Sequence, residues 1–171
     1  MQQLIQDLLA YSRVGRYELK QQPTDCNAVL QQVQQNLQAA IAESNAILTV
    51  DPLPTIFADT VQVTQLFQNL VGNALKYRGD APPMIRVSAR QQSKAWVFSV
   101  QDNGIGIEPQ YAERIFEIFQ RLHTRREYQG TGLGLAICKK IVERHHGHLW
   151  VESQLGQGAL FCFTLPALLN D

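Results

Sequence analysis

The chain has 171 residues, of which 45% are hydrophobic and 18% are charged. This balance supports a buried core and excludes an intrinsically disordered chain. Fifteen basic and fifteen acidic residues give no net charge, so the composition provides no overall positive field for nucleic acid or an anionic membrane. We therefore expect one domain with a short appendage, no nucleic-acid partner and no membrane contact.

The three cysteines, Cys26, Cys138 and Cys162, are odd in number and show no C-x-x-C spacing. The sequence therefore predicts neither a disulfide framework nor a zinc site. No apolar run approaches the roughly 18 residues that span a bilayer, and the N-terminal segment lacks the basic-then-apolar order of a signal peptide. These features favour a cytoplasmic protein.

The N-terminal segment is predicted to form a helix that ends at Gly15. Two interpretations of its apolar stripe are open: the helix packs on its own domain, or it is the end of a longer bundle or coiled-coil helix. The stripe consists of Met1, Leu4, Leu8 and Tyr11, with Ile5 on its flank.

Capping residues and apolar periodicity predict two further helices. Thr24 or Asp25 is placed to cap a helix that runs to about Glu43, and Asp59 is placed to cap a helix over about 60–77. The other expected elements, in chain order, are strands 46–50 and 55–58, a hairpin of strands 84–91 and 95–102, a helix over 132–146, and a hairpin of strands 148–153 and 158–166.

Two glycine-rich segments, DNGIGI at 102–107 and GTGLGLAI at 130–137, are compatible with either structural turns or a ligand site. Gly130, Gly132 and Gly134 precede or begin a helix, where free N–H groups and the helix dipole favour a phosphate. Asp102 follows a strand, and its carboxylate can accept a hydrogen bond from an exocyclic amine. Together the two segments favour a nucleotide site.

The helix expected over 60–77 carries a polar stripe. Asn69, Asn73, Lys76 and Tyr77 fall at i, i+4, i+7 and i+8, on one helix face. Amide oxygens are suitable ligands for Mg²⁺ together with phosphate oxygens. For one asparagine, hydrogen bonds to neighbouring backbone are the simpler explanation. With a lysine and both glycine-rich segments present, the metal–phosphate interpretation is favoured.

The chain contains, in chain order, the segments NLVGNALKY, DNGIGI, RIFEIFQR, GTGLGLAI and GQGALFCFTLP. Together these five segments resemble the catalytic ATP-binding domain of sensor histidine kinases, within the gyrase, Hsp90, histidine kinase and MutL superfamily. The segments LLAYSRVG, KYRGDAPP and FQRLHTRREYQGTG further resemble kinases of the phytochrome-associated type. The resemblance implies an α+β fold, a two-layer sandwich (Bergerat fold) in which three helices cover one face of a mixed five-stranded sheet.

The resemblance also implies ATP and Mg²⁺ as cofactors and assigns site residues. Asn73 is similar to the Mg²⁺ ligand, Asn69 and Lys76 to phosphate-supporting residues, and Asp102 to the adenine-recognising aspartate. Phe116 and Phe119 occupy the aromatic segment at the base of a lid. The remaining nucleotide-binding residues implied are Tyr77, Gly104, Gly106, Ile107, Gly130, Thr131, Gly132, Leu133, Gly134, Leu135 and Thr164, with Gly106 and Thr164 assisting Asp102 through water.

A local basic cluster lies in the implied lid. Exposed charges of this kind are usually a solvated surface. Because phosphoryl transfer needs cationic donors, we expect one or two of them to contact the γ-phosphate. The cluster is Arg121, His123, Arg125 and Arg126.

The residue one turn before Asn73 bears on the reaction. Hydrolases of the superfamily resemble one another in having a glutamate there as general base, whereas this chain has Asn69, and an amide cannot take a proton from water. We therefore expect transfer of the γ-phosphoryl group to a histidine on a separate helical-bundle domain, with a response regulator downstream.

The acceptor histidine is expected to lie outside this chain, because His123, His145, His146 and His148 lack a phosphoacceptor context. Residues 1–21 resemble the C-terminal end of the bundle helix with its linker, and residues 22–171 resemble the catalytic domain. Two alternative functions are a serine/threonine kinase of the anti-sigma-factor type and a non-catalytic nucleotide-binding regulatory module. The aromatic segment and the N-terminal helix disfavour the first, and the intact site residues disfavour the second.

Overall fold

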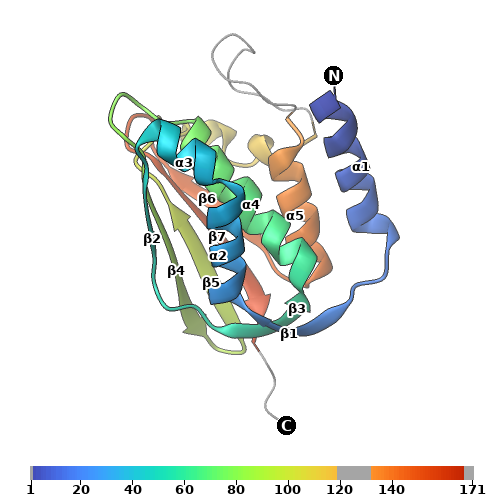
Figure 1. Ribbon diagram of the computed structural model, residues 1–171. Coiled ribbons are helices and arrows are strands. Elements are labelled where there is room, and N and C mark those ends of the chain that lie inside the picture. The colour runs from blue at the N-terminus through green and yellow to red at the C-terminus, as the bar shows by residue number, and fades with distance from the viewer. Residues whose placement is uncertain (1, 119–131, 168–171) are drawn as a thin grey trace.

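A computed structural model describes residues 2–118 and 132–167, in which helices cover one face of a five-stranded sheet (Figure 1). The order in the sheet is β2-β4-β5-β7-β6. Strand β2 runs parallel to β4, and the other neighbouring strands are antiparallel, so the expected mixed sheet is confirmed. The strands are β2 (Ile47–Val50), β4 (Met84–Gln92), β5 (Ala95–Gln101), β6 (Leu149–Ser153) and β7 (Ala159–Pro166).

The helical layer consists of α2 (Cys26–Asn36), α3 (Gln38–Ser44), α4 (Thr60–Lys76) and α5 (Gly134–Arg144). Both expected caps are present. The Asp25 carboxylate accepts a hydrogen bond from the Asn27 amide N–H at 2.9 Å, and that of Asp59 accepts one from the Gln62 amide N–H at 3.1 Å. Two short 3₁₀ turns, η1 (Pro109–Tyr111) and η2 (Arg114–Phe116), follow β5.

Two helix predictions need correction. The helix expected to run to Glu43 is broken at Leu37, which joins α2 to α3. Apolar periodicity does not reveal this break, because Val33, Leu37 and Ile41 keep a four-residue spacing across it. The last helix begins at Gly134, two residues later than expected, since Gly132 has a left-handed φ of 78°.

One strand was absent from the sequence prediction. Strand β1 (Gln21–Asp25) pairs antiparallel with β3 (Thr55–Asp59) in a separate two-stranded sheet. The segment QQPTD has no apolar alternation, and only Thr24 in it is buried. Its extended form depends on hydrogen bonding to β3, a partner about 30 residues away in the chain.

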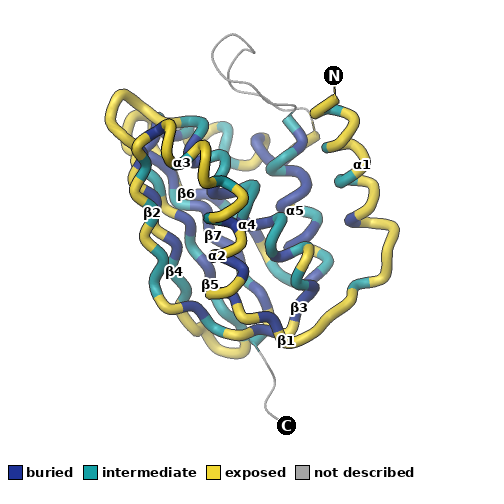
Figure 2. Tube along the Cα trace, in the orientation of Figure 1, coloured by how far each residue is buried: buried dark blue, intermediate teal, exposed yellow. Residues whose placement is uncertain are grey.

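Three phenylalanines join the helical layer to the sheet. Phe67 of α4 lies edge-on to Phe98 of β5 and Phe163 of β7, with ring centroids 5.7 and 5.3 Å away, and the two sheet rings stack at 5.1 Å. All three are fully buried. Figure 2 shows the buried residues concentrated between the two layers, so one core supports the fold.

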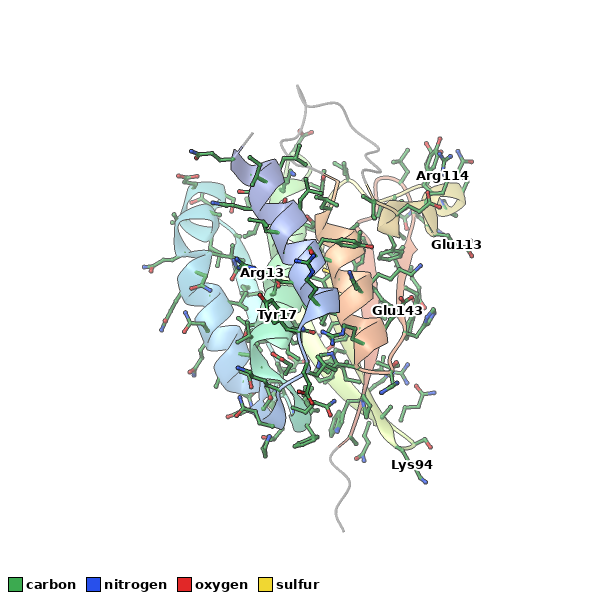
Figure 3. The ribbon with its side chains drawn as sticks, turned by 90° about the vertical axis from the view of Figure 1, so that its right-hand side faces the viewer. Arg13, Tyr17, Lys94, Glu113, Arg114 and Glu143 are labelled. Atoms are coloured by element: carbon green, nitrogen blue, oxygen red, sulfur yellow. The ribbon has the colours of Figure 1, made fainter. Side chains whose placement is uncertain are left out.

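Helix α1 (Gln2–Arg16) packs beside α5 (Figures 1 and 3). Leu4 and Tyr11 of the expected stripe contact the core, but Leu8 and Ile5 are exposed, and Val14 is the buried residue instead. The helix therefore packs on its own domain and keeps an outward apolar face. The expected stop at Gly15 is one residue early.

Cationic side chains of α5 hold the end of α1. The Lys140 ammonium donates to the Tyr11 carbonyl at 3.0 Å, and the Arg144 guanidinium donates to the carbonyls of Val14 and Tyr17. Cations at a helix C-terminus satisfy its free carbonyls and oppose its negative dipole end. Among the described helices, none is both long and apolar enough to cross a membrane.

Candidate functional site

A cavity of about 350 Å³ lies between α4 and the start of α5. Asn69, Asn73, Lys76 and Tyr77 line it from α4, and Gly132, Gly134 and Leu135 line it from the other side. The structure therefore brings together the predicted polar stripe and the described part of the second glycine-rich segment.

The stripe faces the cavity because the rest of α4 is committed to the core. Leu66, Leu70 and Ala74 are among its buried residues, so the polar residues at the intervening helical positions emerge beside the core. Three further residues of α4 line the cavity at the same helical spacing, namely Gln65, Gln68 and Gly72.

The two asparagines make different contacts. The side-chain amide of Asn69 donates to the Gly134 carbonyl at 3.3 Å and so connects α4 to α5. Burial raises the pKa of the nearby Cys138 thiol to about 12, so this thiol is neutral at physiological pH. Asn73 makes no side-chain hydrogen bond within residues 2–118 and 132–167, so its amide is available to a ligand.

The start of α5 is suited to an anion. Leu133 stands at the N-cap and supplies no side-chain hydrogen bond to the first N–H groups of the helix. A Cβ built on Gly134 would meet no atom within 4 Å, so the helix start is open. Lys76 adds a positive charge at the cavity wall, with its Nζ 5.1 Å from the centroid of the Tyr77 ring. Dipole and cation thus favour phosphate at the same place.

Asp102 follows the end of β5 and is anchored on β7. Its Oδ1 accepts hydrogen bonds from the amide N–H groups of Gly104 at 2.8 Å and Ala159 at 3.2 Å. Its Oδ2 accepts none from the described part of the chain, which leaves one carboxylate oxygen for a ligand. Burial raises the pKa of this carboxyl above its ordinary value, and the two backbone hydrogen bonds partly offset that rise.

The glycines beside Asp102 are required by close packing of the loop. A Cβ on Gly104 would lie 2.3 Å from the Tyr77 carbonyl oxygen, and one on Gly106 would lie 2.1 Å from that of Gln154. Gly106 also has a left-handed φ of 74°. These glycines therefore let the loop approach the end of α4 and the β6–β7 turn.

Asp102 and Asn73 line two different cavities in the described structure, and these share no lining residue. Asp102 and Ile107 line one of about 530 Å³, beside the β6–β7 turn. Tyr77 connects the helix that carries Asn73 with the loop that follows Asp102. Its amide N–H donates to the Asn73 carbonyl at 2.9 Å, and its carbonyl accepts from the Ile105 amide N–H at 3.1 Å. The two predicted parts of the site thus meet at the end of α4.

Thr164 is a correction, because the structure does not bring it to Asp102. It pairs with Val97 on the neighbouring strand, and its hydroxyl accepts a hydrogen bond from the His148 amide N–H at 2.9 Å. Asp102 is bonded instead to Ala159, at the other end of β7. A residue five positions along an extended strand is roughly 16 Å away, so Thr164 cannot share a water with Asp102.

Phe116 is in place as a core aromatic, with its ring edge-on to Phe161 at 6.3 Å. Several predicted residues lie outside the described residues: Phe119, Gly130 and Thr131 of the binding set, and the basic cluster of Arg121, His123, Arg125 and Arg126.

Sequence reasoning missed several residues that line the first cavity. Gln65 and Gln68 share the helix face of Asn69, so the same periodicity would have found them. Gln3 and Asp7 of α1 had no such signal, because only the packing of α1 on α5 brings them to the cavity wall. The others are Leu37, Gly72, Ile115 and Ile137.

Residues 58–169 match the family of histidine kinase-, DNA gyrase B- and HSP90-like ATPases. The chain belongs to this family. As a member, it has the Bergerat sandwich expected above, and its fold class is confirmed. This ATPase-family domain is 55% identical over 166 residues to cyanobacterial phytochrome A of Nostoc sp. (strain PCC 7120 / SAG 25.82 / UTEX 2576), which confirms the resemblance to the phytochrome-associated type. The match covers 97% of this chain and 22% of that phytochrome.

Solved histidine kinases share the fold of this ATPase-family domain. Full-length ShkA in complex with AMPPNP superposes with a TM-score of 0.82 at 34% sequence identity, over 95% of this chain and 35% of ShkA. The histidine kinase ThkA in complex with the response regulator protein TrrA gives a TM-score of 0.76 at 25% identity, over 96% of this chain and 46% of ThkA.

Proposed function

We propose that this chain is the ATP-binding part of a sensor histidine kinase and supplies the γ-phosphoryl group to a histidine on a helical-bundle domain. The observation that carries the proposal is the cavity in which Asn73 and Lys76 of α4 face the start of α5. ShkA, the similar kinase solved with AMPPNP, supports ATP as the nucleotide.

The residues at this cavity fit a magnesium ion that arrives with the nucleotide. Within the described residues, no group of three or more histidine, cysteine, aspartate or glutamate side chains could hold a metal by itself. Mg²⁺ usually keeps several waters and binds through few protein oxygens together with phosphates. One amide oxygen, that of Asn73, meets this requirement, and the bound ion would supply charge neutralisation for the phosphates.

The protein groups would divide the nucleotide between them. Asp102, at the strand end, would accept a hydrogen bond from the adenine amine through its Oδ2. Lys76 and the N–H groups at the start of α5 would stabilise the triphosphate, as in other phosphoryl-transfer sites. Gly104 and Gly106 would act indirectly, by allowing the loop to pack beside Tyr77.

Asn69 favours transfer over hydrolysis. Its side chain donates to the Gly134 carbonyl, and an amide cannot act as a general base on water. The bound ATP would therefore be kept until a stronger nucleophile, a histidine imidazole, reaches it.

The partners and the domain division are part of the same proposal. Residues 1–21 would continue a helix of the bundle domain, and residues 22–171 would form the catalytic domain. The outward apolar face of α1, with Ile5, Leu8 and Leu9 exposed, supports such a continuation. A response regulator downstream is supported by the ThkA–TrrA complex, and a cytoplasmic location would suit these partners.

The test is titration of the chain with ATP, with Mg²⁺ and with EDTA. We expect Mg²⁺ to increase the affinity of the wild type for ATP. In Asn73→Ala this increase should be smaller by about tenfold or more, the scale of one lost hydrogen bond or ligand contact. The matched control is Gln32→Ala, which removes an exposed amide from α2. Equal Mg²⁺ dependence in Asn73→Ala and the wild type would contradict the assignment.

A further inference from the structure

The loop that carries Asp102 contacts β4 through one side chain. The pairing of β5 with β4 ends at Gln101 and Arg86, although β4 begins two residues earlier, at Met84. Met84 pairs with Ile47 of β2 on its other side. The main chain at the start of β4 therefore faces no paired strand on the β5 side.

The side chain of Asn103 takes the place of that missing strand. Its Oδ1 accepts a hydrogen bond from the Met84 amide N–H at 2.8 Å, and its Nδ2 donates to the Pro82 carbonyl at 3.2 Å. Pro82 and Pro83 have no N–H of their own, so a conventional ladder could not continue here. An asparagine amide supplies both an acceptor and a donor, as this position requires.

This contact completes the support of Asp102. On the β7 side, the Asp102 amide N–H donates to the Ala159 carbonyl at 2.9 Å, and the Asp102 carboxylate accepts from the Ala159 amide N–H at 3.2 Å. On the β4 side, the adjacent Asn103 clamps the segment 82–84. Asn103 is itself exposed, so burial contributes little to holding this part of the loop. The residue is therefore placed to set the position of the neighbouring carboxylate.

We infer that Asn103 is a positioning residue that directs the Asp102 carboxylate at the nucleotide base and so sets the preference for adenine. This inference rests on the proposed function, in which Asp102 recognises the 6-amino group. Loss of the clamp should reduce discrimination between bases more than it reduces binding of the triphosphate, which would lie in the cavity between α4 and α5.

The experiment compares the affinities for ATP and inosine triphosphate, in which oxygen replaces the 6-amino group. We expect Asn103→Ala to lower the ATP preference about tenfold, the order expected when one buried-site hydrogen bond is misaligned. Asn103→Asp keeps the acceptor and loses the donor, so its preference should fall between those of Asn103→Ala and the wild type. If Asn103→Ala does not fold, the comparison can be made with Asn103→Asp alone.

The chain offers a matched control in Asn27. Its Nδ2 donates to the Leu53 carbonyl at 2.8 Å, and its Oδ1 accepts from the Leu53 amide N–H at 2.9 Å. Asn27 lines neither of the two cavities. Asn27→Ala should lower thermal stability and leave the ATP preference unchanged. A wild-type preference in both Asn103 variants, or an equal loss in Asn27→Ala, would overturn the inference.

Asp102→Ala separates this inference from the proposed function. If Asp102→Ala keeps the ATP preference, the base-recognition role of Asp102 is wrong and the role of Asn103 fails with it. If Asp102→Ala abolishes the preference and Asn103→Ala preserves it, only the positioning role fails. We expect the double variant Asp102→Ala/Asn103→Ala to have the same ATP preference as Asp102→Ala, because Asn103 acts through Asp102.

Discussion

Asp102 has two requirements that oppose each other. Burial raises the pKa of its carboxyl and so favours the protonated form in the folded chain. Acceptance of a hydrogen bond from an amine, in contrast, is strongest for the carboxylate. A group whose environment favours the form that function does not use is typical of binding and active sites.

The first prediction concerns the pH dependence of this residue. Since the folded-state pKa is raised, the free energy of unfolding should fall as pH rises from the ordinary value of 3.8 through the higher folded pKa. Asp102→Asn keeps an acceptor for the Gly104 and Ala159 N–H groups and carries no charge. This variant should therefore lose that pH dependence and be more stable than the wild type at neutral pH, but bind ATP about tenfold more weakly.

Urea unfolding of both proteins across this pH range, with ATP titration at neutral pH, makes the comparison. A wild type that gains stability relative to Asp102→Asn as pH rises would show that the shift has the opposite sign.

Helices α4 and α5 are joined at two places. Near the cavity, Asn69 donates to Gly134, and at the opposite end His145 bridges the two helices. His145 is buried, its Nδ1 lies 2.8 Å from the Ile141 carbonyl oxygen, and its Nε2 accepts from the Asp59 amide N–H at 3.1 Å. These contacts require a neutral ring with its proton on Nδ1.

The second prediction follows from that neutral ring. Burial lowers the pKa of His145 from 6.5, partly offset by the Ile141 hydrogen bond and the Asp59 charge, whereas Arg144 and His146 lower it further. Its stabilising contribution should be complete above pH 6.5 and be lost as pH falls through the lower folded pKa. His145→Ala should cost about 1–3 kcal/mol at neutral pH and remove this acid sensitivity.

Denaturant unfolding at several pH values measures both effects, and His148→Ala, which alters an exposed histidine, is the control. A His145→Ala protein with wild-type stability at neutral pH would contradict the role of His145 as a link between the helices.

The third prediction concerns the docking of α1. Arg144 donates to two carbonyls at and beyond the end of α1, whereas Lys139, on the same helix, pairs with Glu143 of that helix at 3.9 Å. Figure 3 shows α1 lying across α5, with Tyr17 at its end. Arg144→Ala should accelerate amide hydrogen exchange in α1 about tenfold, because its terminal carbonyls lose their cationic partner. Lys139→Ala should leave this exchange unchanged, and equal acceleration in both variants would argue against a specific clamp.

At the scale of the whole molecule, the two ends of α5 have different surroundings. The start of α5 lines the same cavity as Asn73, whereas its C-terminus, with His145, lies beside the first residues of α4. His146 and His148 follow that far end. An eleven-residue helix is roughly 16 Å long, so these three histidines are far from the proposed triphosphate.

The fourth prediction follows from this separation. The chain incubated with γ-labelled ATP should form no stable phosphohistidine on His145, His146 or His148. Addition of a bundle domain from a similar kinase should transfer the label to that domain. Gel analysis after alkaline treatment, which preserves phosphohistidine, followed by peptide mapping, measures the label. Label on any of these three histidines would contradict the proposed division of labour between domains.

Much of the site could be predicted from the sequence because its determinants are local. The carboxylates of Asp25 and Asp59 bond to N–H groups two or three residues away, so the helix starts are readable from short segments. Asn69, Asn73 and Lys76 share a helix face through spacing alone. A strand end at Asp102 follows from the alternation before it.

Only the tertiary structure decided the remaining features, because their partners are distant in the chain. The pairing of β1 depends on β3, the place of Asp7 depends on the docking of α1, and Thr164 is separated from Asp102 by the register of β7. The clamp of Asn103 on Met84 likewise joins residues whose sequence neighbours show no sign of the contact. Local hydrogen bonds and helical spacing thus specify the elements, whereas packing and strand register determine which side chains meet.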